Sequence, residues 1–461
     1  MRGDFSRETF DPLRHFSRVL VQQGRLQMDA DSNEQSEILL HYLRTLATDL
    51  IGAHGGPGTG FTIGMPAAGV KQDFPIAPGR YYVEGVLVEN DAADLMYSKQ
   101  PGYTKADELA DGKRNLVYLD VWERHVTALD DDAIRDVALG QVDTTTRSQV
   151  MWQVRTLSRN AKNDADLPAF GTDWAKWLDD QGGLAAWFGA WPPKLRGALK
   201  ARGRSGGAEE QPCIITPESS FRGLENQLYR VEIHRGGKAG PAGKATFKWS
   251  RNNGSDVVAV KSLAAGIASL TSLGRGDRET FEPDDWVEIV EDGAALLGLP
   301  GQLATVVSVE SDDMTVTLKP KDGATLPSFT AAECSAKHVQ LRRWDYRIGA
   351  PAGTGDRPKP ADDGALVVEE GKWLALEDGV QVLFAAAAAP DTYEYRAADY
   401  WTIPARTATG DVDWPGPVDH PEARPPRGVR HFHAPLAVVD VTGGAVTGVK
   451  PLRHTMKPVG L

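Results

Sequence analysis

The sequence has few of the residues that build metal centres, disulfide frameworks or membrane spans. Only Cys213 and Cys334 occur in 461 residues, with no partner spacing for zinc or a disulfide framework. We expect both to be buried free thiols. No run approaches the roughly 18 apolar residues that a membrane-spanning helix needs. No apolar signal-peptide core follows Met1, which favours a cytoplasmic location.

Basic residues are also fewer than acidic ones. The chain carries 51 Lys and Arg against 63 Asp and Glu, for a net charge of −12. Nucleic-acid binding and attraction to anionic membranes both need the opposite sign, so neither partner is expected. The 41% apolar and 25% charged fractions are ordinary for a globular protein. The length exceeds what one hydrophobic core usually organises, so we expect two to four domains.

Strand patterns dominate the chain. Residues 285–290, 304–309 and 314–318 have the spacing and turn residues of a small barrel, and 116–122 is a near-continuous apolar run typical of a buried strand. We predict a mainly β fold, a multi-domain β-sandwich and small barrel, with an N-terminal helix and a helical insertion. The predicted parts are a docking segment with a capped helix (1–55), a small β domain (56–130), a helical, Trp-rich insertion (131–212), a β domain with a barrel at about 280–345 (213–345), and a C-terminal β domain (346–461).

Helical periodicity is clearest near the N-terminus. Apolar residues recur at three- and four-residue intervals from Ser32 onward, which predicts one face of a helix: Ile38, Leu39, Tyr42, Leu43, Leu46 and Leu50. Asp31 or Ser32 is placed to cap this helix, and Gly52 is placed to end it. Within the insertion, Val150, Val154 and Leu157 suit a second, shorter helix.

The first fifty residues are dense in side chains that bond to neighbouring backbone and run straight into this helix. We interpret them as a fixed docking element. The aromatic, amide and arginine side chains that we expect to dock are Phe5, Phe10, Phe16, Arg18, Gln22, Gln23 and Arg25.

None of the three sequence motifs for metal binding, phosphate binding or catalysis is complete. Residues 29–34 begin like a calcium loop, but an EF-hand needs Gly and Glu where Glu34 and Leu40 stand. The glycine-rich stretch 52–60 lacks the lysine of a phosphate loop, because Phe61 follows it. Residues 203–207 fit G-x-S-x-G without the strand and helix that a nucleophile elbow requires. No catalytic residue and no cofactor are therefore assigned.

Two groups of side chains remain candidates for binding. His431 and His433 would share one face of a strand and could hold a metal if a third ligand converged; hydrogen bonding to loops is the commoner role. The second group could stack on sugars or simply pack the insertion, and comprises Trp174, Trp177, Trp187 and Trp191.

Several segments resemble an uncharacterised bacterial domain family from gene clusters of phage-tail-like contractile injection systems. These segments are 3–6, 10–12, 17–25, 143–155, 225–234, 245–255 and 399–412. The resemblance spans almost the whole chain, and Ser32 departs from it where the family often has tryptophan. Residues 78–85 are also similar to segments of phage baseplate and fibre-attachment proteins.

The resemblance implies a non-enzymatic structural or particle-associated component of such a particle, of the baseplate or fibre-attachment type. Its partners would be other proteins of the particle, with a homo-oligomer as a further option. Release as part of an extracellular particle is then compatible with a cytoplasmic origin. Two alternatives stay open: a cargo or effector protein, such as a hydrolase, and a carbohydrate-binding module.

Overall fold

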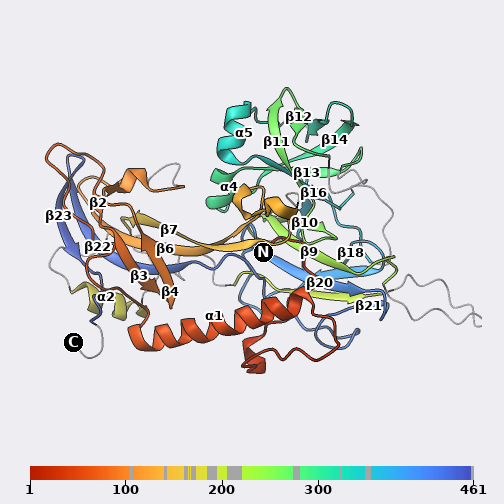
Figure 1. Ribbon diagram of the computed structural model, residues 1–461, viewed down its shortest axis with the longest axis horizontal. Helices are drawn as coiled ribbons and strands as arrows, with labels where there is room; N and C mark the ends of the chain where they lie inside the picture. The colour runs from red at the N-terminus through yellow and green to blue at the C-terminus, as the bar shows by residue number, and fades with distance from the viewer. Residues whose placement is uncertain are drawn as a thin grey trace, which may run out of the picture. The chain divides into compact units, whose positions relative to one another are not determined.

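The protein is described by a computed structural model, in which the described residues are 1–102, 107–139, 143–159, 165, 167, 173–183, 195–204, 221–273, 281–321, 324–347 and 355–457. They are mainly β-strand, with a closed six-stranded barrel and a few helices, which confirms the predicted fold class. The chain forms two compact units, each assembled from separated stretches (Figure 1). The first unit comprises Met1–Glu8, Val126–Arg147 and Leu195–Gly428, and the second comprises Thr9–His125, Ser148–Lys194 and Val429–Leu461.

The first unit contains two open sheets. One has the strand order β17-β10-β9-β20-β21 and the other β18-β19-β8. Their bounds are β8 Leu199–Gly203, β9 Gln227–Arg235, β10 Thr246–Ser250, β17 Leu366–Val367, β18 Trp373–Ala375, β19 Val380–Phe384, β20 Tyr400–Arg406 and β21 Asp411–Val412. Two short 3-10 helices, η3 Asp132–Ile134 and η4 Val137–Leu139, also belong to this unit.

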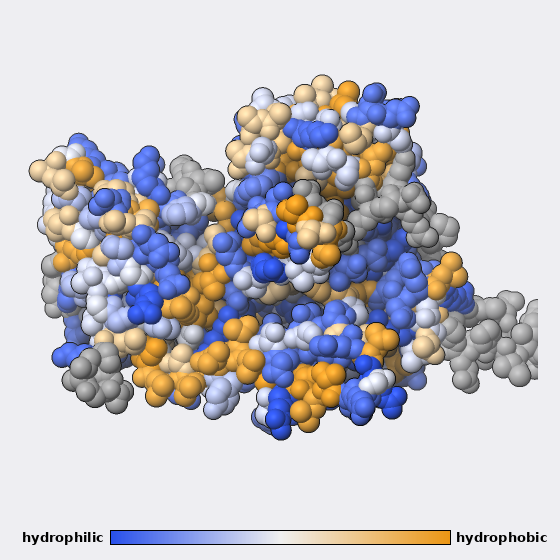
Figure 2. Space-filling model, viewed as in Figure 1, coloured by the Kyte–Doolittle hydropathy of each residue, from blue (hydrophilic) through white to orange (hydrophobic). Residues whose placement is uncertain are grey.

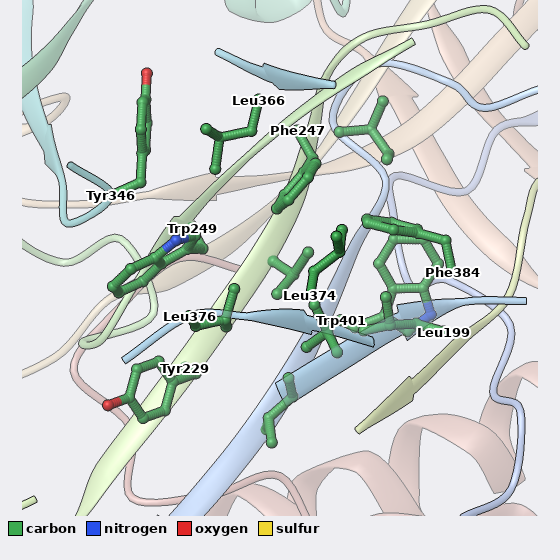
Figure 3. Close-up of a cluster of buried hydrophobic side chains, with 14 of the residues drawn as sticks. Leu199, Tyr229, Phe247, Trp249, Tyr346, Leu366, Leu374, Leu376, Phe384 and Trp401 are labelled. Carbon is green, nitrogen blue, oxygen red and sulfur yellow. The ribbon is translucent and has the colours of Figure 1, made fainter. Parts of the chain in front are cut away.

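Aromatic and aliphatic side chains together fill the core of these sheets (Figure 3). Phe247 of β10 and Phe384 of β19 meet edge to face with ring centroids 5.0 Å apart, and Phe384 meets Trp401 of β20 in the same way at 5.9 Å. Large aromatic rings bury much apolar area and favour this geometry. The core therefore joins strands that lie far apart in the sequence.

The barrel has the order β11-β12-β15-β14-β13-β16 and closes by pairing β16 with β11. Its strands are β11 Val257–Ala264, β12 Ile267–Leu270, β13 Trp286–Val290, β14 Gln302–Glu310, β15 Thr315–Pro320 and β16 Gln340–Trp344, with helices α4 Asp292–Leu296 and α5 Ala331–Lys337. The predicted barrel is thus confirmed and begins earlier, at Val257. Cys334 of α5 is a buried free thiol within the barrel core, as expected, whereas Cys213 lies outside the described residues.

The second unit is built on a sheet of order β23-β22-β6-β7, with smaller sheets β1-β3-β4 and β2-β5. The strands are β1 His54–Gly55, β2 Pro75–Ile76, β3 Gly79–Val83, β4 Val86–Asn90, β5 Leu95–Met96, β6 Arg114–Val126, β7 Arg147–Leu157, β22 Phe432–Thr442 and β23 Ala445–Pro451. In β6, Asn115 to Trp122 are all buried, as a near-continuous apolar run predicts for a central strand. In β4, buried Val86, Val88 and Asn90 alternate with exposed residues, which is the pattern of a half-buried strand.

One predicted helix is wrong. Residues 150–157 belong to strand β7, not to a helix. Val150, Trp152 and Val154 pack against one core, so the relevant apolar period is two. The four-residue step from Val150 to Val154 fits either element, and Trp152 decides for the strand.

The long helix α1, Asp29–Ile51, was predicted correctly at its end and too late at its start. Gly52 terminates it, and its N–H bonds to the carbonyl of Thr48 at 2.8 Å. The helix begins three residues earlier than Ser32, with Met28 at the N-cap position. Asp31 accepts a hydrogen bond from the Met28 N–H, so it caps the helix from inside the first turn.

Three more helices lie among the described residues of the second unit: α2 Trp174–Asp180, η1 Pro12–Arg14 and η2 Tyr97–Lys99. No helix in the described part of the chain is long and apolar enough to cross a membrane.

Candidate functional site

The segment that leads into α1, residues 9–28, is called the arm below. Its only regular structure is η1, which Asp11 caps by accepting from the Leu13 N–H. Side chains of α1 fix the arm at two points: Thr9 donates to Glu34 at 2.6 Å, and Gln35 accepts from the Val19 N–H at 2.9 Å. The arm is therefore held in one course along the helix without packing its own side chains into a core.

Large apolar side chains of the arm lie in solvent. Leu13 is 77% exposed, Leu20 70%, Val21 65% and Leu26 91%. Single exposed apolar residues are normal, but three leucines and a valine within fourteen residues form a cluster of the kind that marks interaction surfaces. The arm thus exposes large apolar side chains of the kind that folded proteins usually bury.

The structure places most of the predicted docking residues on this arm. Phe10 is half-buried, with its ring 5.8 Å from that of His41 on α1. Phe5 is half-buried and belongs to the first unit, so it does not share the arm. The others are exposed side chains of the arm: Phe16, Arg18, Gln22, Gln23 and Arg25.

The apolar residues of α1 divide between two faces. Ala30 and Ile38 are buried, whereas the other five members of the predicted apolar face are exposed: Leu39, Tyr42, Leu43, Leu46 and Leu50. Figure 2 shows apolar residues along the exposed side of this helix. The outward five are called the seam below. Periodicity identified an apolar face, but the side of α1 that packs on its own unit is a different one.

The packed side of α1 is fixed by polar and backbone contacts. Arg44 forms two parallel hydrogen bonds to Glu123, at 2.8 and 3.0 Å. The α-carbon of Gly85, which has φ +75°, lies so close that an added Cβ would come 2.2 Å from the Arg44 carbonyl oxygen. Such close approach requires glycine and prevents α1 from rolling to bury its seam.

His431 and His433 meet on one carboxylate. Asp120 of β6, nearly fully buried, lies opposite His433 in the register of β6 and β22. Its Oδ1 is 2.8 Å from Nδ1 of His431 and 3.5 Å from Nε2 of His433, and Arg155 Nη1 lies 3.8 Å from its Oδ2. Trp122 stacks on the His431 ring at 5.2 Å. A carboxylate that orients an imidazole in this way can support proton transfer.

The two histidines both contact the carboxylate of Asp120, and this contact is an ion pair or hydrogen bond and not a metal site. Within the described ranges, no group of three or more His, Cys, Asp or Glu is arranged to hold a metal ion. Metal binding by His431 and His433 therefore stays a prediction without a geometric argument in its favour.

The predicted tryptophan platform is only partly described. Trp174 is buried in a core with Leu116 and Leu178, and meets Trp177 edge to face at 5.3 Å. Trp174 is therefore a packing residue. Trp187 and Trp191 lie outside the described residues.

A buried ionic cluster in the first unit was not predicted. Arg230, Glu232 and His234 occupy alternate positions of β9 and so share one face, while Lys248 of β10 lies opposite Glu232. Lys248 donates to Glu288 of β13 at 2.6 Å. The signal was present in the sequence as ionisable residues at every second position of an apolar strand.

The N-terminal residues complete this cluster. Arg2 donates to both oxygens of Glu232, at 3.1 and 2.5 Å, and Arg230 donates to Glu232 at 2.6 Å. Asn253 donates to the carbonyl of Gly3 at 3.0 Å. Buried charges need such full pairing to be tolerated, so the cluster fastens residues 1–3 to the first unit.

The cluster holds its groups in defined charge states. Burial would raise the pKa of Glu288, but Lys248 outweighs it and lowers the pKa to about 2. Burial also opposes ionisation of Glu232, yet Arg2 and Arg230 keep the pKa of this carboxyl well below its usual range. Burial lowers the pKa of His234 to about 4, so its imidazole is neutral at pH 7. Glu232 and Glu288 are therefore charged and His234 is neutral at pH 7, as in a buried cluster that stabilises the fold; we call this role a structural lock.

The family model described as "Family of unknown function (DUF6519)" matches residues 1–176 and 190–448. The match covers most of the sequence, so the chain belongs to this family. Neither the comparison with curated proteins nor that with solved structures found a match.

Proposed function

We propose that this member of the family of unknown function DUF6519 is a non-enzymatic structural component of a larger protein assembly. The assembly we propose is a phage-tail-like contractile injection particle, with this chain near the baseplate or at a fibre attachment. Its partners are other proteins of that particle. The observation that carries the proposal is the arm, an ordered segment with its large apolar side chains in solvent.

The energetics of the arm favour a docking role. Burial of one leucine side chain contributes about 1.5–3 kcal/mol, so Leu13, Leu20 and Leu26 together can supply most of the free energy of a stable contact. The bonds from Thr9 and Val19 to α1 already order the arm. A preordered segment loses less conformational entropy on binding, which leaves more of the burial energy as affinity.

Composition of purified particles tests the proposal. A structural part is expected at a fixed ratio to the other particle proteins in quantitative mass spectrometry, at a multiple of three or six copies. The double variant Leu20→Glu/Leu26→Glu should fold normally and disappear from particles, because both positions are exposed in the free chain. Leu224→Glu, at a fully exposed position of the first unit, is the control and should be retained.

Two results contradict the proposal. One is absence of the chain from particles washed free of loose protein. The other is retention of the arm variant at the wild-type ratio, since the arm would then contribute nothing to assembly.

The second candidate function is a cargo protein, such as a hydrolase, that the same kind of particle carries. The observation that favours it is the convergence of His431 and His433 on Asp120, since a carboxylate–imidazole pair is a common acid–base device. Cargo would vary in amount from particle to particle. His431→Ala/His433→Ala should abolish toxicity to target cells if this function holds, and unchanged toxicity rejects it.

A further inference from the structure

We propose that the seam of α1 pairs with the same seam of a second copy of this chain, antiparallel, about a two-fold axis that passes between Arg44 and Thr45. This inference deepens the proposed docking role and rests on it for the view that the N-terminal element is an interface. In this arrangement the seam contacts the second copy, and the arm remains available to contact other proteins of the assembly.

The seam is an unusual surface for a helix that already packs on its own unit. Leu39 is 53% exposed, Tyr42 68%, Leu43 59%, Leu46 45% and Leu50 75%. The four leucines are three or four residues apart, and Tyr42 is three residues from Leu39 and four from Leu46, so all five lie in one stripe along three turns of helix. Stripes with this spacing pack against another helix at a shallow angle, as in coiled coils.

The spacing of the leucines indicates that the partner of the seam is a second copy of the same chain. From Leu39 to Leu43, Leu46 and Leu50 the steps are four, three and four residues, a series that reads the same in both directions. A two-fold antiparallel pair therefore places Leu39 opposite Leu50 and Leu43 opposite Leu46 of the second copy, and the reverse. It also places Tyr42 opposite the small Ala47, which leaves room for the phenol ring. Self-complementarity of this kind is the condition for an isologous contact.

The exposed area is of the size such a contact needs. The five seam side chains together expose on the order of 550 Å², near the upper end of the largest apolar patch on a typical monomer. A stable interface buries about 800 Å² on each partner. Leu40, 40% exposed beside the seam, and the polar side chains that border it can supply the remainder.

The helix is presented rigidly for this contact. Arg44 is clamped to Glu123 on the packed side, and the Gly85 backbone lies against the Arg44 carbonyl. Because α1 cannot turn its seam inward, pairing requires no rearrangement of the unit, and the helix is preorganised for it.

The full-length protein tests the oligomeric state. Sedimentation equilibrium of the wild type should give a dimer at micromolar concentration. Leu43→Glu/Leu46→Glu places four carboxylates at the centre of the contact and should weaken dimerisation at least about 100-fold, with an unchanged circular dichroism spectrum. Leu299→Glu, at a position 58% exposed in the first unit, is the matched control and should leave the dimer intact. A monomeric wild type, or a double variant that dimerises normally, overturns the proposal.

Disulfide trapping tests the orientation in a Cys213→Ser background, where the remaining Cys334 is buried. A mixture of Leu39→Cys and Leu50→Cys chains should form a cross-linked dimer, and neither chain should do so alone. Cross-linking of Leu39→Cys with itself would show a parallel pair and overturn the antiparallel arrangement.

The outcomes separate the two proposals. A monomer that still depends on the arm for particle assembly overturns only the self-pairing. A dimer that never enters particles overturns only the assembly role.

Discussion

Neutralisation of Glu232 provides the sharpest test of the ionic cluster as a structural lock. In Glu232→Gln the shape of the side chain is kept and its charge is removed. The carboxylate contacts Arg2, Arg230 and Lys248, the last at 3.4 Å. In the variant the two arginines lose this counter-charge in a buried place, and Lys248 keeps only its contact with Glu288. Removal of one partner from a buried ion pair costs about 3–5 kcal/mol. We expect a loss of stability of that size, confined to the first unit.

Calorimetry of the full chain measures this loss. For large domains, 1 kcal/mol corresponds to roughly 2–4 °C in Tm, so the transition of the first unit should fall by about 6–20 °C. The control is Glu282→Gln, whose side chain is 70% exposed and lies 3.5 Å from Arg347. An exposed pair of this kind contributes at most about 1 kcal/mol, so the control should barely shift.

A double variant separates charge from packing. Arg2→Met removes one of the three cations, so in the Glu232→Gln background it should recover part of the lost stability, although alone it destabilises. Strictly additive losses in the double variant, or a Glu232→Gln transition that matches the Glu282→Gln control, would refute the electrostatic reasoning.

The remaining predictions concern acid sensitivity and the seating of α1. Because the folded pKa of His234 is about 4, below its ordinary value near 6.5, its contribution to stability is complete above pH 6.5 and is lost as pH falls towards 4. Urea titrations should show about 2 kcal/mol lost between pH 7 and 5 from this group, and His234→Gln should remove that part of the pH dependence. Gly85→Ala should cost about 2–4 kcal/mol and raise proteolysis of α1, because left-handed strain and a backbone clash add. Gly112→Ala, also left-handed but with open space around the α-carbon, should cost about 1 kcal/mol.

Local features of this fold were readable from the sequence because their causes are local. Gly52 ends α1 because glycine readily adopts the positive φ, 88° here, that the helix end requires. The near-continuous apolar run from Leu116 to Trp122 marks a central strand because both of its faces are covered. Three of the six barrel strands, β13, β14 and β15, were predicted from their spacing and turn residues in the same way.

Features that depend on distant partners were not readable. Strand β6 pairs with β22, so that Asp120 meets His433 from more than 300 residues away, and no local pattern specifies that register. The cluster at Glu232 needs cations from β9, β10 and residue 2 at once. The seam shows the limit most clearly, because periodicity finds an apolar face on α1 but does not say what covers it.

Hydroxyl-radical footprinting of the chain, free and within purified particles, tests the assembly role most directly. The account predicts that the arm leucines Leu13, Leu20 and Leu26, highly reactive in the free chain, become protected in the particle, while Leu224 stays reactive in both. Equal reactivity of the arm in the free and particle-bound chain would contradict it.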